Sequence, residues 1–169
     1  MMDETRFRAF YQEMFPRLWS YAHRLVMDRS ECDDAVQEAF FRFLRSAPPK
    51  LSETDQRSYL YRIATNLVKD AWRSKSTEQK WLAEQDDDDQ VSEPESGIGA
   101  GIDITRAMAI LSPAQRSLVW LAYVEGYEHR EIAEIVGVKP ASVRVLLMRA
   151  RRRLAEFLAD APQEGQESR

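Results

Sequence analysis

The sequence contains a single cysteine, Cys32, and only two histidines, His23 and His129, among its 169 residues. One cysteine cannot form an internal disulfide, and this small set cannot assemble a metal site from histidine and cysteine ligands. No stretch approaches 18 consecutive apolar residues, and the charged first residues are not followed by an apolar segment. We therefore expect neither membrane insertion nor a secretory signal, and the chain is predicted to be cytoplasmic.

Strand signals are missing as well, because no run of alternating valine, isoleucine and threonine occurs in the chain. Apolar residues instead recur at spacings of three and four, which is typical of amphipathic helices. The first predicted helix contains Pro16, which should kink or break it. The second begins at Ser30 and ends at Ala47-Pro48-Pro49, and a third follows a polar loop that extends to about Asp55. The predicted fold class is all-α.

Shorter helices are predicted after residue 105. Ser112-Pro113-Ala114-Gln115 combines an N-cap serine, a proline at the first helical position and a capping-box glutamine. That helix is expected to stop near Gly126. Glu128 and Lys139 stand at the N-cap positions of the next two helices, where serine or threonine would accept amide hydrogen bonds, so these starts are expected to be less rigid.

The net charge of the chain is −4, but the charged residues are distributed unevenly along it. Residues 1–75 carry 13 basic against 11 acidic side chains, residues 76–105 carry one against nine, and residues 106–158 carry nine against five. The acidic segment is rich in glycine and poor in large apolar residues, which predicts a flexible linker. The alternative is an acidic mimic of nucleic acid that rests on a basic surface. We predict two small helical domains over 5–76 and 105–159, the flexible acidic linker over 77–104, and a disordered tail over 160–169.

The segment from Glu131 to Leu154 has the pattern of a helix-turn-helix. Ala133 allows close packing, Gly137 suits a turn with positive φ, and Pro140 opens the second helix. The outer face of that helix is rich in arginine, which can bind phosphates or guanine edges, although a merely solvated face would look similar. The candidate duplex-binding residues are Lys139, Ser142, Arg144, Val145, Met148, Arg149 and Arg152.

Basic and aromatic residues alternate in a second segment, from Arg57 to Lys75. Basic side chains can follow a phosphate backbone, and exposed aromatic rings can stack on unpaired bases. The alternative for Tyr59, Tyr61 and Trp72 is that they pack in or beside the core. The candidate single-strand-binding residues are Arg57, Tyr61, Arg62, Asn66, Lys69, Arg73 and Lys75. A third segment places Asp33, Asp34, Gln37 and Glu38 on a polar helix face, for which solvation is the default explanation.

Two sets of motifs resemble the extracytoplasmic-function (ECF) sigma factors of bacterial RNA polymerase. Asp34-Ala35-Val36-Gln37-Glu38-Ala39-Phe40 and Tyr59-Leu60-Tyr61-Arg62-Ile63-Ala64-Thr65-Asn66, with Asp70 and Arg73, resemble region 2. Leu111-Ser112-Pro113-Ala114-Gln115-Arg116, Glu125-Gly126-Tyr127, Glu131-Ile132-Ala133 and the segment from Val143 to Leu154 resemble region 4. The two matches cover roughly residues 7–75 and 105–158, in the order of the family.

The resemblance implies roles for all three segments. The acidic face (Asp33, Asp34, Gln37, Glu38) would dock on the clamp helices of the largest polymerase subunit. The basic–aromatic helix, with loop residues near Ser52 to Arg57, would capture the melted −10 element. The helix-turn-helix would read the −35 element and contact the flap of the second-largest subunit. An anti-sigma factor is a further implied partner, whereas no cofactor and no catalytic activity are expected.

The sequence departs from the family pattern at two places in these segments. Thr65 stands where family members usually have a basic residue, so one phosphate contact is expected to be missing. Val145-Leu146-Leu147-Met148 stands where the recognition helix usually reads Ser-Arg-Leu-Ser. Apolar contacts with thymine methyl groups could replace part of the usual −35 contacts.

Two other classes of function are alternatives to a sigma factor. A one-component regulator would bind a duplex operator through the helix-turn-helix and use residues 1–75 for dimerisation or sensing, but a sensor would not need the basic–aromatic helix. An enzyme is disfavoured because no glycine-rich phosphate loop and no nucleophile–base spacing occur. Paired carboxylates such as Asp33 and Asp34 point about 100° apart on a helix and so form a poor metal site.

Overall fold

The computed structural model describes residues 2–26, 28–46, 50–75 and 104–160, and every regular element in these ranges is helical. The all-α prediction is thus confirmed. The N-terminal half consists of α1 (Glu4–Val26), α2 (Arg29–Ser46) and α3 (Glu53–Lys75). The C-terminal half consists of α5 (Ile104–Ala109), α6 (Pro113–Val119), the π-helical turn η1 (Trp120–Val124), α7 (His129–Val136) and α8 (Pro140–Asp160). Apart from Ile104 and Asp160, the predicted acidic linker and tail lie outside the described residues.

A kink or a break is expected at Pro16, and the first helix continues through this residue, so the break does not occur. A proline inside a helix removes one backbone hydrogen bond and typically costs about 3 kcal/mol or more. Met14 and Leu18, one on each side of the proline, are fully buried, and α1 packs on both α2 and α3. We attribute the continuity of α1 to this tertiary packing, which outweighs the local preference.

The next two helices begin earlier than the sequence indicates. Asp28, rather than Ser30, caps α2, because its Oδ1 accepts a hydrogen bond from the N–H of Glu31 at 2.9 Å. Ser52 caps α3 by accepting from the N–H of Asp55 at 3.2 Å. Consequently most of the stretch from Ser52 to Arg57, which was expected to be a loop, forms the first turns of α3.

The predicted capping box at α6 is confirmed. The N–H of Gln115 donates to Ser112 Oγ, and the N–H of Ser112 donates to Gln115 Oε1, both at 3.1 Å. The helix then widens into η1, where the N–H of Glu125 donates to the carbonyl of Trp120, five residues earlier, at 3.1 Å. The chain turns at Gly126 with φ of 74°, as its position in the sequence indicates.

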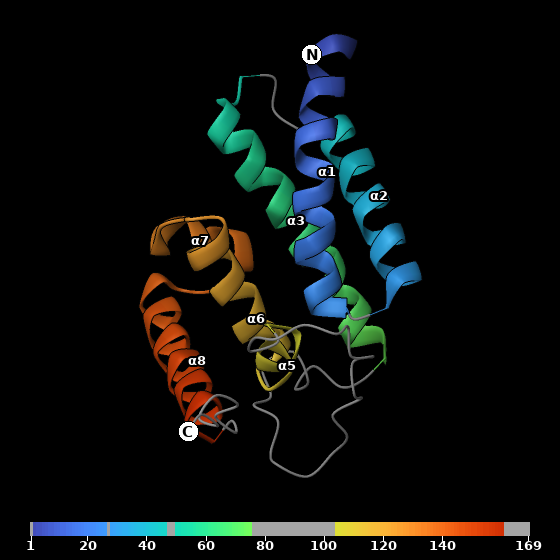
Figure 1. Ribbon diagram of the computed structural model, residues 1–169. Helices are drawn as coiled ribbons and strands as arrows, with labels where there is room; N and C mark the ends of the chain where they lie inside the picture. The colour runs from blue at the N-terminus through green and yellow to red at the C-terminus, as the bar shows by residue number, and fades with distance from the viewer. Residues whose placement is uncertain (1, 27, 47–49, 76–103, 161–169) are drawn as a thin grey trace, which may run out of the picture.

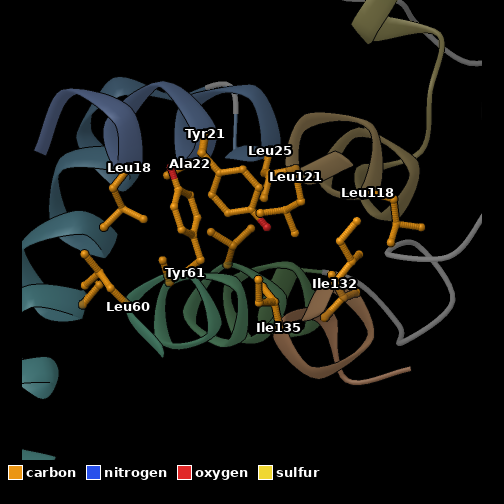
Figure 2. Packing of buried hydrophobic residues seen from close by; sticks show 14 of the residues in the cluster. Leu18, Tyr21, Ala22, Leu25, Leu60, Tyr61, Leu118, Leu121, Ile132 and Ile135 are labelled. Carbon is orange, nitrogen blue, oxygen red and sulfur yellow. The ribbon is translucent and has the colours of Figure 1, made fainter. Parts of the chain in front are cut away.

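The two halves pack against each other in an arrangement that we call closed. Within the N-terminal half α1, α2 and α3 contact one another, and within the C-terminal half α8 packs on α6 and α7. Between the halves, α6 contacts α1 and α7 lies beside α3 (Figure 1). Figure 2 shows buried side chains from both halves facing one another, and they form a single hydrophobic cluster. The labelled members are Leu18, Tyr21, Ala22, Leu25, Leu60, Tyr61, Leu118, Leu121, Ile132 and Ile135.

Candidate nucleic-acid and polymerase interfaces

A helix-turn-helix is formed by α7 and α8. Gly137 ends α7 with φ of 77°, and its N–H donates to the carbonyl of Ala133 at 2.9 Å. Glu128 at the start of α7 is capped differently from the expectation, because its own N–H donates to Glu131 Oε2 at 2.9 Å. The weakness expected at that helix start is therefore partly compensated by an acidic residue in the first turn.

The orientation of α8 follows from its buried stripe. Val143, Leu147 and Ala150 are buried, which turns the opposite side of the helix to solvent. There the structure places what we call the α8 face, formed by the exposed residues Arg144, Val145, Met148, Arg149 and Arg152. Lys139 is also exposed and Ser142 is half-buried. The seven predicted duplex-binding residues thus lie at the turn or along α8, and the exposed arginines alternate with the apolar surface of Val145 and Met148.

The basic residues of α3 lie at helical spacing along one side of the helix. We call Arg62, Asn66, Lys69 and Arg73 the α3 stripe. Three of them are exposed, whereas Lys69 is half-buried and its ammonium donates to the carbonyl oxygen of Val136 at the end of α7. Burial lowers the pKa of Lys69, and neighbouring Arg73 lowers it further.

The remaining predicted residues of this group have different surroundings. Arg57 is half-buried and forms an ion pair with Glu13 of α1 at 2.6 Å. Lys75 ends α3, but its side chain lies outside the described residues. Tyr61 is fully buried, so in the closed arrangement it cannot stack on a base, contrary to the exposed position that a stacking role requires. Tyr59 and Trp72 are half-buried, which favours the packing alternative for these aromatic residues.

The hydroxyl of Tyr61 donates to Glu125 Oε1 at 2.6 Å. The other carboxylate oxygen of Glu125 accepts from Arg17 of α1, and the side chain of Glu125 is only 3% exposed. The hydrogen bond to Glu125 raises the pKa of Arg17, and burial raises the pKa of Tyr61. The partners of Glu125 are not predictable from the sequence, because both are distant in the chain and the π-helical turn places Glu125 outside the α-helical period.

A second polar contact joins the halves at Tyr21. Its hydroxyl lies 2.7 Å from Thr65 Oγ1 and 2.6 Å from Ser117 Oγ, and all three side chains are fully buried. Nearby, the guanidinium of Arg116 donates to the carbonyl oxygens of Arg24 at 2.8 Å and Leu111 at 3.1 Å. Burial lowers the pKa of Arg116 to about 10. The buried hydroxyl of Tyr21 and the buried guanidinium of Arg116 thus both have hydrogen-bond partners in the other half.

The acidic face of α2 is accessible, with Asp33, Asp34 and Gln37 exposed. Asp33 accepts a hydrogen bond from Trp19 Nε1 at 2.7 Å, and half-buried Glu38 pairs with Arg42 at 2.7 Å. The same helix also exposes two large apolar side chains, Phe41 and Leu44, each 53% exposed. The helical spacing of Val36, Ala39, Phe40, Phe43 and Leu44 predicts that all five face the core, and this prediction is wrong for Leu44, which is exposed.

Other kinds of site find no support in the part of the chain that the structure describes. No group of three or more His, Cys, Asp or Glu side chains is arranged to hold a metal ion among these residues. Within the same ranges, no helix combines the length and the apolar character that a membrane span requires.

Comparisons with known proteins match both halves. Residues 10–78 match the family model of sigma-70 region 2, and residues 102–154 match that of sigma-70 region 4. The chain is 31% identical over 159 residues to the ECF RNA polymerase sigma factor SigL of Mycobacterium tuberculosis, covering 87% of this chain and 85% of that protein. It is 32% identical over 160 residues to the ECF sigma factor SigE of Mycolicibacterium smegmatis, covering 90% of this chain and 61% of that protein.

The fold is also similar to a solved structure, that of the sigma factor RpoE from Bartonella quintana in complex with the anti-sigma factor NepR. The two folds agree with a TM-score of 0.67 at 22% sequence identity. The match covers 92% of this chain and 99% of that one. At this level of identity the likeness concerns the fold.

Proposed function

The chain belongs to the ECF sigma factors of bacterial RNA polymerase, and we propose that it directs the polymerase core to specific promoters by recognising −10 and −35 elements and assisting promoter melting. The observation that carries this proposal is the presence of regions 2 and 4 in one chain and in the family order. A one-component regulator is not favoured, because residues 10–78 match region 2 where that alternative would place a sensor or dimerisation domain.

The α8 face is our candidate for reading the −35 element. A helix of a helix-turn-helix enters the major groove with residues near its start facing base edges. Arg144 and Val145 lie in that part of α8, and Arg149 and Arg152 lie further along the same exposed face. An arginine can donate two hydrogen bonds to guanine, and the apolar side chains of Val145 and Met148 can contact thymine methyl groups.

The α3 stripe, together with Arg57 and Lys75, is our candidate for capturing the −10 strand. Its basic groups can follow a phosphate backbone, and Asn66 can donate to and accept from a base. Tyr61 can join this group only in an arrangement in which the C-terminal half no longer covers it, because it is fully buried here.

Docking on the polymerase core is assigned to α2. Asp33, Asp34, Gln37 and Glu38 would contact the clamp helices of the largest subunit, and the C-terminal half would contact the flap of the second-largest subunit. Exposed Phe41 lies one turn beyond Gln37 and would extend the docking surface with an apolar contact. A polar rim beside an apolar anchor is the usual composition of a protein–protein interface.

This role requires no catalytic group and no cofactor from the chain, and its place is the cytoplasm, where the polymerase works. The solved relative RpoE was captured with an anti-sigma factor. An anti-sigma factor is therefore a proposed partner of this chain as well.

Run-off transcription from a randomised promoter library tests the proposal. Bacterial core polymerase with this protein should give transcripts from a subset of templates that share a −10 and a −35 sequence, and core alone should not. A protein that binds duplex DNA but gives no core-dependent transcript would instead be a one-component regulator.

A further inference from the structure

We infer that the closed arrangement withholds Lys69 of the α3 stripe, together with Tyr61, from the −10 strand while it leaves the α8 face open to duplex DNA, and that Glu125 is the latch of this arrangement. The inference rests on the proposed function, since it assigns an order to the two DNA contacts. It adds that this chain restrains its own −10 contact before any other protein binds.

Lys69 is the member of the α3 stripe that the C-terminal half covers. Its ammonium is held by the carbonyl oxygen of Val136, and α7 packs along α3 at this point. The turn of the helix-turn-helix is equally close, because a Cβ atom built on Gly137 would lie 3.7 Å from Lys69 Nζ. A phosphate that approached Lys69 would have to displace both the carbonyl and the turn, so the C-terminal half and a −10 strand compete for the same group.

The α8 face is not involved in this contact. Its five residues are exposed while α7 covers Lys69, because α8 packs on α6 and α7 through its opposite side. The closed protein therefore presents its duplex-binding surface and withholds part of its single-strand-binding surface. Simultaneous engagement of both elements requires the two halves to separate.

Glu125 fulfils the requirements for a latch because its side-chain partners belong to the other half. Arg17 comes from α1 and Tyr61 from α3, whereas Glu125 itself follows η1. Closure buries the carboxylate to 3% exposure, and each hydrogen bond in which it takes part is charge-assisted. Loss of the carboxylate leaves the Tyr61 hydroxyl and Arg17 without this acceptor only when the halves are closed, so the open arrangement is not penalised.

The test compares Glu125→Ala with Glu134→Ala in the full-length protein. Glu134 lies on the same half and is exposed, so both variants lose one carboxylate and change the net charge equally. The probes are a fluorescein-labelled single-stranded oligodeoxynucleotide of mixed sequence and the same strand annealed to its complement. Anisotropy at one fixed salt concentration reports binding, because phosphate contacts are strongly salt-dependent.

Apparent affinity for the single strand scales with the fraction of open protein. We expect E125A to bind the single strand about tenfold more tightly than the wild type, the change that corresponds to about 1.4 kcal/mol. Duplex affinity should match that of E134A. Glu125→Gln, which keeps the size of the side chain, should increase single-strand affinity by a smaller factor. This variant replaces E125A in the test if E125A is poorly folded. Equal single-strand affinity of the wild type and both Glu125 variants, or an increase shared by E134A, would overturn the inference.

A second measurement separates this inference from the proposed function. Dyes are attached to cysteines at exposed Gln12 of α1 and Glu156 of α8 in a Cys32→Ser background, and energy transfer is recorded in single molecules. One high-transfer population is expected for the parent, and an additional low-transfer population for E125A. If these populations appear but neither protein supports transcription with core, the proposed sigma-factor role is wrong, and the inference that Glu125 holds the halves closed is supported. If both proteins support transcription but show the same distribution of energy transfer, the inference that Glu125 holds the halves closed is wrong and the sigma-factor role is supported.

Discussion

The hydroxyl of Tyr21 lies 2.6 Å from Oγ of Ser117, a residue 96 positions later in the chain. The same hydroxyl lies 2.7 Å from Thr65 Oγ1, so one phenol connects α1, α3 and α6. Because all three side chains are fully buried, none of these hydrogen bonds can be exchanged for water while the halves are closed. The contact between the halves is thus specific as well as apolar.

Docking on the core should depend on the exposed part of α2. We expect Asp34→Arg combined with Gln37→Ala to abolish the binding of core polymerase in a pull-down experiment. Both positions are exposed, so helicity and melting temperature should change little. Glu156→Arg, the same reversal at an exposed site in the other half, should leave docking intact. Undiminished capture of core by the double variant would disprove the assignment of this face.

The arginines of the α8 face should have different effects on promoter choice. Arg144 lies near the start of α8, so Arg144→Ala should relax the preference at one −35 position, and a bidentate contact with guanine is worth about 1–3 kcal/mol of discrimination. Val145 is adjacent, so a thymine is expected next to the relaxed position. Promoter-library transcription measures this effect, and a uniform loss with an unaltered −35 preference would contradict base reading by Arg144.

Arg149→Ala should instead reduce output from all promoters alike, because a phosphate contact carries no sequence information. The slope of log affinity against log salt concentration should fall by about one. Titrations at several salt concentrations with the two arginine variants provide the comparison. A change in sequence preference for Arg149→Ala would reassign it to a base.

Alkaline pH should destabilise the fold through its buried phenols. Burial raises the pKa of Tyr21 and of Tyr127 to about 12, above the ordinary value of 10.0. The folded protein therefore holds more protons than the unfolded chain between these values, and its stability should fall as pH rises from about 10 to about 12. Near pH 11, absorbance at 295 nm should show less phenolate in the folded protein than in the denatured chain at the same pH. Tyr21→Phe should reduce this difference.

The start of α2 offers a direct test of its cap. Asp28→Ala should lower the free energy of unfolding by about 0.5–2 kcal/mol, because it removes the acceptor for the N–H of Glu31. Ser30→Ala should cost close to nothing, since Ser30 is exposed and already lies inside the helix. Urea denaturation of both variants measures the difference, and the opposite ranking would return the cap to Ser30.

The local features of the fold were predictable from the sequence because they depend on residues close together in the chain. The capping box at Ser112, the turns at Gly126 and Gly137 and the buried stripe of α8 are set by spacing and by backbone preference. Pro16 is the counterexample, since its effect on α1 depends on packing against α2 and α3. Residue spacing and backbone preference predict where a helix begins and ends. They do not predict where a long-range contact outweighs such a local preference.

The candidate sites were predictable to different degrees for the same reason. The α8 face follows from the period of one helix, and its exposure agrees with the expectation. Tyr61, Lys69 and Glu125 were not predictable, because their surroundings come from the other half of the chain. Thr65 illustrates this point, since the position where the family usually has a basic residue here lies buried against Tyr21. A charged side chain at that position would have to lose its water for the halves to close.

Closure also depends on the order in which the ribosome makes the chain. Arg116, whose guanidinium binds the carbonyl of Arg24, is synthesised 41 residues after Lys75 ends α3. At about 5–20 residues per second, Arg116 follows the end of α3 by roughly 2–8 s, and α7, which covers Lys69, follows later still. During synthesis the apolar sides of α1 and α3 that face α6 and α7 are therefore in contact with water. Every newly made copy passes through a stage in which Lys69 has not yet been covered by α7.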